Sequence, residues 1–296
     1  MNIGIIGESL GNGHPYSWSA IINGFNYNLL NKLPFPAIKQ YLADKDHNKV
    51  LDKNIRVTKI FCKNIDYAKK VAEFSKINEV CISLENFSNN LHAIIIAKDD
   101  YKNHYDLIDT LSPLKLPILI DKPIATKLDD LIKILKLKKY ESQFFSCSGL
   151  YFSPEINDFP RSLNELNKIK VVTNGPWDRY SIHMINPLEK YFGDNDIEFS
   201  KFTSFKKSTF KNVVHLELEY NNLIVELVSG SDQIFGVNFT FYYRTGVSQS
   251  IKLTNTYKAF SDMLSCFLDQ IKYDKLFFSE QYLKNTVKII ELGVNH

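Results

Sequence analysis

The sequence predicts an α/β half built on a parallel sheet, followed by an α+β half with a large, mainly antiparallel open sheet. Two observations lead to this fold class. Up to residue 125, short apolar strand segments alternate with amphipathic helical segments, a pattern typical of doubly wound sheets. From residue 143 onward, longer alternating strands follow one another, and two helical segments close the chain. We therefore expect two domains, residues 1–125 and residues 126–296.

In the first half, the strand segments are short and continuously apolar, as is typical of strands covered on both faces. The connection formed by residues 25–54 is long for a link between a helix and a strand, so we expect a lid or a specificity element there. We expect strands at residues 2–6, 56–61, 93–97 and 117–120, and helices at residues 67–75 and 103–111.

In the second half, apolar and polar residues alternate along the strands, so one sheet face should pack on helices. The other face is mixed and is expected to be wet or to meet another subunit. Short turns such as Tyr-Asn-Asn and Arg-Thr-Gly indicate antiparallel neighbours. We expect strands at residues 144–150, 169–172, 198–206, 213–220, 223–229, 237–244 and 248–253, and helices at residues 259–271 and 280–292.

Composition excludes several functional classes. The net charge of +3 over 296 residues, without a basic block, argues against nucleic acid as a partner. The apolar runs are too short to cross a bilayer, so we expect no membrane partner and a cytoplasmic protein. The cysteines lie far apart and outside metal-ligand spacing, which indicates a reducing compartment and no metal site; they are Cys62, Cys81, Cys147 and Cys266.

The opening NIGIIGESLGNGHPYSWSAI is a strand, a Gly-rich turn and a helix. Glycines allow a pyrophosphate to approach the backbone at a helix N-terminus, where free N–H groups and the helix dipole favour anions. The spacing departs from G-x-G-x-x-G, so an ordinary strand-turn-helix is the alternative. As candidate cofactor contacts, the turn supplies Gly7, Ser9, Leu10, Gly11 and Asn12.

The ends of the next two strands extend this candidate site. The second strand is followed by Cys62 and Lys63 instead of the acid that binds the ribose of NAD. The missing carboxylate favours NADP(H) over NAD(H), although Lys63 is also compatible with a solvated loop. After the next strand come Lys98 and Asp99, and then His104 in the first turn of a helix, where a capping or packing role is the alternative.

In PILIDKPIAT, an apolar strand ends in Asp121, Lys122 and Pro123. Open α/β sheets bind ligands beyond the carboxyl ends of their strands, which makes Lys122 a candidate for chemistry. Pro123 biases Lys122 toward an extended conformation and restricts where its amine points. Taken alone, the segment is also compatible with a solvated turn.

In GPWDRYSIHMINPLEKYFG, a helix is expected to begin near residue 177. On such a helix His183 shares a face with Arg179, Tyr180 and Asn186, so these side chains are candidates to line one pocket.

Together these segments resemble the Gfo/Idh/MocA family of NAD(P)-dependent oxidoreductases, and the resemblance runs along the whole chain. The GIIG strand, AIIIAKDDYKNHY, DKPIAT in the place of the family's Glu-Lys-Pro segment, and the closing AFSDMLSCFLDQIKYDKLFFSEQYLKNTVKIIELG come in the family's order. The Lys-Pro segment is the most specific of these elements.

The resemblance implies a Rossmann domain, NADP or NAD as cofactor, and hydride transfer between the nicotinamide and a sugar-type substrate, such as a sugar phosphate or a nucleotide sugar of surface-carbohydrate synthesis. Lys122 is then expected near the reacting hydroxyl, with Asp121 and Pro123 among the cofactor contacts, and His183 exchanges the proton with help from Tyr180. A homo-oligomer, dimer or tetramer, is expected through the C-terminal sheet.

One segment departs from the family pattern. The family's Asp-x-Gly-x-His-x-x-Asp corresponds to residues 179–186, where only His183 is retained. Arg179 and Asn186 replace two acids, so the site loses negative charge that would raise the pKa of His183. A catalytically silent relative that binds a dinucleotide or a sugar as a regulator or scaffold is therefore the alternative hypothesis.

Overall fold

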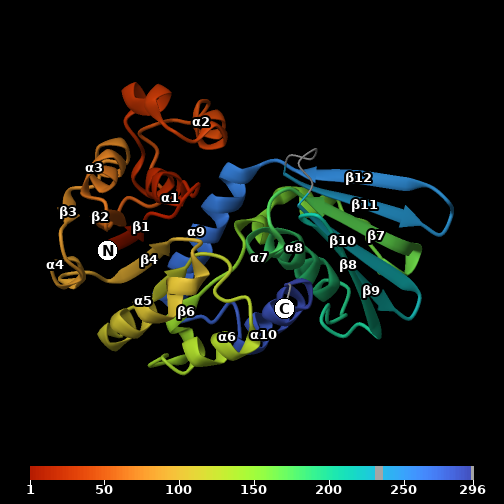
Figure 1. The fold of residues 1–296 in the computed structure, drawn as a ribbon. Helices are drawn as coiled ribbons and strands as arrows, with labels where there is room; N and C mark the ends of the chain where they lie inside the picture. The colour runs from red at the N-terminus through yellow and green to blue at the C-terminus, as the bar shows by residue number, and fades with distance from the viewer. Residues whose placement is uncertain (231–235, 295–296) are drawn as a thin grey trace. The chain divides into compact units, whose positions relative to one another are not determined.

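The computed structural model describes residues 1–230 and 236–294 (Figure 1). Two units divide the chain. The first comprises Met1–Ile124, Lys133–Ser146 and Phe260–Phe278, and the second comprises Ala125–Ile132, Cys147–Ala259 and the chain from Ser279. Each unit is built on one six-stranded sheet.

The first sheet is parallel, with the strand order β3-β2-β1-β4-β5-β6. Its central strands are apolar on both faces because helices cover both faces, and Ile94, Ile95 and Ile96 are fully buried. The strands are β1 Asn2–Gly7, β2 Arg56–Phe61, β3 Glu79–Cys81, β4 Ala93–Ala97, β5 Ile118–Ile120 and β6 Phe144–Phe145.

Local sequence signals explain where the helices of the first unit begin. Pro15 stands in the first turn of α1, where its missing N–H costs no helical hydrogen bond. Asn64 caps α3 by accepting a hydrogen bond from the Tyr67 N–H at 3.0 Å. The helices are α1 His14–Asn23, α2 Pro36–Leu42, α3 Ile65–Phe74, α4 Leu84–Ser88 and α5 His104–Leu111. The long connection between α1 and β2 contains α2 and a 3-10 helix, Tyr27–Lys32.

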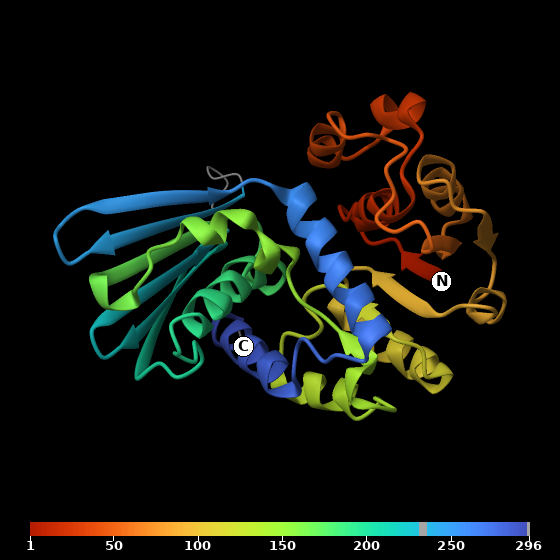
Figure 2. The ribbon, with the colours of Figure 1, turned by 180° about the vertical axis from the view of Figure 1, so that it is seen from behind.

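Helix α9 (Thr256–Tyr273) belongs to the first unit from Phe260 onward, although it lies near the end of the chain. Its Phe267 is fully buried and meets the ring of Phe145 on β6 with 5.6 Å between the ring centroids. Figure 2 shows this helix in blue beside the yellow strands at the end of the first sheet. The first unit is thus completed by a distant part of the sequence.

The second sheet has the strand order β12-β11-β7-β10-β9-β8. Strands β7 and β10 pair in parallel and the other neighbours are antiparallel. The Tyr-Asn-Asn turn joins β9 to β10, as its sequence predicts. The strands are β7 Leu166–Thr173, β8 Ser204–Phe210, β9 Val213–Tyr220, β10 Leu223–Ser229, β11 Val237–Tyr243 and β12 Ser248–Leu253.

One face of the second sheet packs on helices and the other carries charges. Helices α7 (Trp177–Tyr180), α8 (Ile182–Gly193) and α10 (Glu280–Gly293) lie on the apolar face (Figure 1). There the Trp177 indole donates to the Ile290 carbonyl at 2.8 Å. On the opposite face Lys168 pairs with Glu226 at 2.6 Å. The predicted division into an apolar and a mixed face is confirmed.

The predicted fold class is confirmed, but three predicted elements are wrong in detail. Of residues 144–150, only Phe144–Phe145 form a strand, and this strand pairs with β5 in the first sheet. Residues 198–203 are not a strand, because β8 begins at Ser204. The helix predicted from residue 177 is two helices, α7 and α8. The two strand errors come from apolar segments that have the right alternation and lack a partner in the second sheet.

Candidate functional site

The parallel strands of the first unit bring their carboxyl ends to one edge of the sheet. Strand β1 pairs with β2 and β4, and β4 pairs with β5, all in parallel. The loops that follow these strands contain the residues that the sequence predicts for cofactor contact. This edge is where open α/β sheets bind ligands.

The Gly-rich turn uses its glycines for two different reasons. A Cβ at Gly7 would lie 2.4 Å from Pro15 Cγ, so this glycine allows α1 to pack closely on β1. Gly11 has a φ of +78° and open space around its Cβ position. Leu10 is almost fully exposed at the tip of the turn, and Asn12 closes it by accepting a hydrogen bond from His14 N at 2.8 Å. The turn therefore leaves room for a ligand at the N-terminus of α1.

A buried carboxylate organises the loop after β5. Asp121 is fully buried, and its Oδ2 accepts hydrogen bonds from Asn12 Nδ2 at 2.9 Å and His14 Nδ1 at 2.6 Å. Its Oδ1 accepts from the Lys122 N–H at 2.8 Å. Burial opposes ionisation, but His14, Lys122 and Asn12 outweigh it and lower the pKa of Asp121. Asp121 thus joins the Gly-rich turn to the Lys-Pro segment through charge and hydrogen bonds.

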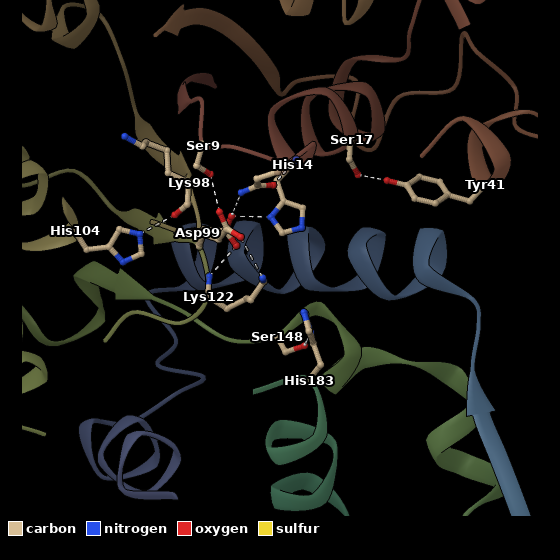
Figure 3. A network of polar contacts seen from close by, with 12 residues as sticks. Ser9, His14, Ser17, Tyr41, Lys98, Asp99, His104, Lys122, Ser148 and His183 are labelled. Carbon is tan, nitrogen blue, oxygen red and sulfur yellow. Dashed lines mark hydrogen bonds and ion pairs between the residues drawn. The ribbon is translucent and has the colours of Figure 1, made fainter. Parts of the chain in front are cut away.

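Lys122 lies beside a second acid. Its Nζ is 3.9 Å from Asp99 Oδ2, and Asp99 Oδ1 accepts a hydrogen bond from the Ser9 hydroxyl at 2.6 Å (Figure 3). Lys122 is only 5% exposed, and its bond to Pro123 is cis. The structure therefore brings together Ser9, Asp99 and Lys122 from three loops, as the sequence predicts for one sheet edge.

His104 has a positioning role in the structure. Its Nε2 lies 2.7 Å from the Lys98 carbonyl oxygen and its Nδ1 lies 3.1 Å from the Ile124 carbonyl oxygen. With both ring nitrogens on backbone carbonyls, the imidazole holds the loops after β4 and β5 together. Figure 3 shows its contact with Lys98. This geometry matches the packing alternative raised by its position in the first helical turn.

A pocket of about 320 Å³ lies at the ends of β1, β2 and β4. Cys62 is buried in its wall, and burial raises the pKa of this thiol to about 12. Lys63 is exposed beside it. The lining residues are Ile6, Gly7, Phe61, Cys62, Lys63, Leu84, Lys98, Asp100, Asn103, His104, Asp106, Leu107 and Thr110. A cavity of this size with mixed walls suits an adenosine group.

In the second unit, His183 and Asn186 meet at Ser148. The Ser148 hydroxyl lies 2.7 Å from His183 Nδ1 (Figure 3). The Ser148 N–H donates to Asn186 Oδ1 at 2.7 Å. The Tyr180 ring lies edge-on to His183 with centroids 5.7 Å apart. Of the four residues expected to share a face, Tyr180, His183 and Asn186 are thus linked here, with Ser148 as an added member.

Asn186 also contacts an acid that the family pattern does not include. Its Nδ2 donates to Glu189 Oε2 at 2.8 Å, and the Thr286 hydroxyl donates to the same carboxylate. Burial raises the pKa of Glu189 to about 7, against the lowering effect of Thr286, Asn186 and Tyr282. An acidic side chain thus lies one helical turn beyond Asn186 on α8, with its ionisation opposed by burial.

His14, Ser148 and Glu189 also belong to these clusters, although the sequence alone did not identify them. His14 carries a usable signal, because it begins the helix after the Gly-rich turn and Asp121 ends a strand at the same sheet edge. Ser148 carries no local signal, since its partners His183 and Asn186 come from another element. Glu189 stands at i, i+3 from Asn186 on α8, but its contact with Thr286 on α10 depends on how the helices pack.

Within residues 1–230 and 236–294, no group of three or more His, Cys, Asp or Glu side chains is arranged to hold a metal ion. The same residues include no helix that is long and apolar enough to cross a membrane.

Comparisons with known proteins agree with this geometry. Residues 38–147 match the GFO_IDH_MocA model, described as an oxidoreductase family with an NAD-binding Rossmann fold. No curated protein matches the chain. The resemblance predicted from the sequence is thus confirmed by the family model, and the solved structures below share the fold over the whole chain.

Three solved structures illustrate this similarity over nearly the whole chain. A dehydrogenase (MviM) from Clostridium difficile has a TM-score of 0.70 at 14% identity, with 99% of this chain and 98% of that chain covered. A putative myo-inositol dehydrogenase from Sinorhizobium meliloti 1021 has a TM-score of 0.67 at 11% identity, covering 98% and 95%. UDP-N-acetylglucosamine 3-dehydrogenase GnnA from Acidithiobacillus ferrooxidans has a TM-score of 0.66 at 12% identity, covering 99% and 96%.

Proposed function

We propose that this chain, a divergent member of the Gfo/Idh/MocA oxidoreductase family, transfers hydride between a nicotinamide dinucleotide and a sugar-type substrate. The observation that carries the proposal is the buried Lys122, held beside Asp99 at the sheet edge that also holds the Gly-rich turn. Solved proteins of the same fold include enzymes named for inositol and for a UDP-sugar, which supports a polyhydroxylated substrate.

The residues of the first unit fit a dinucleotide. The N-terminus of α1 has no acid in its first turn, and the open space at Gly11 allows a pyrophosphate to approach the backbone. The neighbouring pocket has the size and position for the adenosine group. Gly7, Ser9, Gly11 and Asn12 would surround the phosphates, while Cys62, Lys63, Lys98 and His104 would surround the adenosine.

The proposed chemistry divides among a few side chains. When bound, the nicotinamide supplies or accepts the hydride. Lys122 donates a hydrogen bond to the reacting oxygen. The charge of Asp99 and the hydrogen bond from the Lys122 N–H to Asp121 hold Lys122 in place. We assign the exchange of the hydroxyl proton to His183, whose Nδ1 is held by Ser148, and a supporting role to Tyr180.

The substrate classes that we propose are sugar phosphates and nucleotide sugars. We also propose that copies of the chain associate through the charged face of the second sheet, where Lys206 pairs with Glu219 at 2.7 Å. Light scattering of the purified protein tests the association, and a monomer at working concentration would contradict it.

A silent dinucleotide-binding relative is the second candidate, because Arg179 and Asn186 stand where the family pattern has acids. Binding and turnover separate the two functions. Calorimetry with NADH and NADPH measures binding, and a screen of sugar phosphates and nucleotide sugars in both directions measures turnover through the absorbance of the reduced nicotinamide. Binding without turnover of any sugar would favour the silent relative.

If turnover is found, the Lys122→Ala variant should lose activity by about a hundredfold or more, the scale of a positioned acid or base. Dinucleotide affinity should change little, because Lys122 is not expected to hold the phosphates. The exposed Lys70 on α3 offers a matched control, and Lys70→Ala should leave both quantities unchanged. Full activity of Lys122→Ala would refute the proposed role of Lys122.

A further inference from the structure

Glu8, the first residue after β1, reaches the end of β2. Its Oε2 accepts a hydrogen bond from the Asn64 backbone N–H at 2.9 Å, across a separation of 56 residues. Within the described residues, the other oxygen of this carboxylate has no hydrogen-bond partner. An anchored carboxylate with one free acceptor oxygen therefore stands at the end of the second strand.

The backbone of Glu8 is held in an uncommon conformation. Its φ is +89°, in the region that favours glycine and disfavours other residues. Such conformations cost free energy and are concentrated at ligand-binding sites, where surrounding structure maintains them. The conformation at Glu8 is therefore a second observation, independent of the hydrogen bond, that indicates a functional position.

The carboxylate also lies next to the proposed adenosine pocket. The flanking Gly7 lines this pocket, as do Cys62 and Lys63, which immediately precede the residue that Glu8 binds. Burial has the largest effect on the pKa of Cys62, and a hydrogen bond with the Gly7 backbone has the second largest. The negative charge of Glu8 comes third and raises this pKa. In Rossmann folds, an acid at this end of the second strand accepts hydrogen bonds from the ribose hydroxyls of NAD.

We propose that Glu8 takes the place of the missing second-strand acid, binds the adenosine ribose and makes the chain select NAD(H) over NADP(H). This inference rests on the proposed dinucleotide function. The carboxylate accepts hydrogen bonds from ribose hydroxyls and repels a 2′-phosphate, which carries negative charge.

Two lysines that line the pocket, Lys63 and Lys98, favour NADP(H) instead, because their positive charges attract its 2′-phosphate. Lys63 is exposed and solvated, and a lysine side chain must lose rotamer freedom before it holds a ligand. Glu8 is already anchored to the Asn64 backbone, so its interaction needs little further ordering. The balance therefore favours NAD(H), although the residues after β2 alone favour NADP(H).

Calorimetry with NADH and NADPH tests the proposal on the full-length protein and needs no substrate. The wild type should bind NADH at least tenfold more tightly than NADPH. Glu8→Gln keeps the size of the side chain and an acceptor oxygen for Asn64, and should bring the two affinities to within about threefold of each other. Glu73→Gln, an equal charge change at an exposed position on α3, should leave the wild-type ratio unchanged.

The outcomes separate this inference from the function on which it rests. Binding of both dinucleotides with the same ratio in the wild type and Glu8→Gln would overturn the role of Glu8 and leave the proposed function standing. A wild type that prefers NADPH would overturn the selectivity without any variant. Absence of binding by either dinucleotide would overturn the proposed function and this inference together. Thermal unfolding of each variant shows whether the fold is retained.

Discussion

Asp121 and Lys122 are adjacent in sequence and nearly buried, yet they are stabilised in different ways. Asp121 has three hydrogen-bond donors around its carboxylate, which compensate for the loss of water. Because its pKa is lowered, this group adds stability above its ordinary pKa and loses it as the pH falls through the lowered value. Lys122 has the opposite charge of the Asp99 carboxylate 3.9 Å from its Nζ.

In the second unit, a chain of contacts links Glu189 to His183. Glu189 fixes the orientation of the Asn186 amide, and the Asn186 oxygen in turn accepts from the Ser148 N–H. The Ser148 hydroxyl then meets the His183 imidazole. A carboxyl group on α8 is thus connected to His183 through Asn186 and Ser148.

We expect the raised pKa of Glu189 to make stability depend on pH. Between the ordinary pKa of 4.5 and the raised value of about 7, the folded protein keeps a proton that the unfolded chain releases. By linkage, the free energy of unfolding should fall as the pH rises through this window, by on the order of 3 kcal/mol. Glu189→Gln should remove this fall, as measured by urea unfolding at several pH values.

The exposed Glu165 provides the control for that measurement, and Glu165→Gln should keep the wild-type pH dependence. A fall of equal size in Glu189→Gln and in the wild type would show that another group titrates.

At the scale of elements, the junction of β1 and α1 combines a packing constraint with an open turn. Gly7 stands where strand and helix come closest, whereas Gly11 stands where the backbone requires a positive φ. A side chain at either position is unfavourable, but for different reasons. A side chain at Gly7 therefore has a steric cost, whereas a side chain at Gly11 has a cost in backbone conformation.

Gly7→Ala should lower the free energy of unfolding by about 2 kcal/mol, because the new Cβ would lie 2.4 Å from Pro15 Cγ and must displace α1. Gly11→Ala should cost about 1 kcal/mol from its φ of +78° alone. Chemical denaturation measures both, and calorimetry with NADH should show weaker binding for Gly7→Ala because the N-terminus of α1 has moved. Wild-type stability of Gly7→Ala would contradict the close packing of α1 on β1.

At the scale of the molecule, the first unit draws on three separate parts of the chain. Residues 260–278 belong to it even though nearly the whole second unit intervenes in the sequence. Gln270 Nε2 donates to the Ser142 carbonyl at 2.8 Å, which ties α9 to the segment before β6. Folding of the first sheet thus depends on the end of the chain.

Phe267→Ala should test that dependence. Phe267 is fully buried against Phe145, so its removal leaves a cavity and should cost about 3–5 kcal/mol. Phe277→Ala, at a partly exposed position of the same segment, should cost much less. Urea unfolding monitored together with NADH binding should show that Phe267→Ala destabilises the first unit, and equal costs for the two variants would contradict this.

Local sequence was sufficient for much of the fold. Strand β4 and strands β9 and β10 begin and end where their apolar patterns predict, because these patterns depend only on neighbouring residues. The Gly-rich turn and the Lys-Pro segment likewise indicate the ligand-binding edge of a parallel sheet. Where the pattern is equally compatible with two sheets, as at Phe144–Phe145, sequence alone assigns the wrong partner.

By itself, the sequence determined the fold class, most of the strands and which strand ends carry polar side chains. Only the tertiary structure decided which of those side chains meet. His14 lies 107 residues from Asp121, and Glu8 lies 56 residues from Asn64, yet each pair is in hydrogen-bond contact. Periodicity and propensity act over one or two turns of chain, whereas such contacts depend on how strands pair and helices pack across the sheet. For this reason the residues that follow the second strand in the sequence do not include the acid, whereas the fold brings Glu8 to that place.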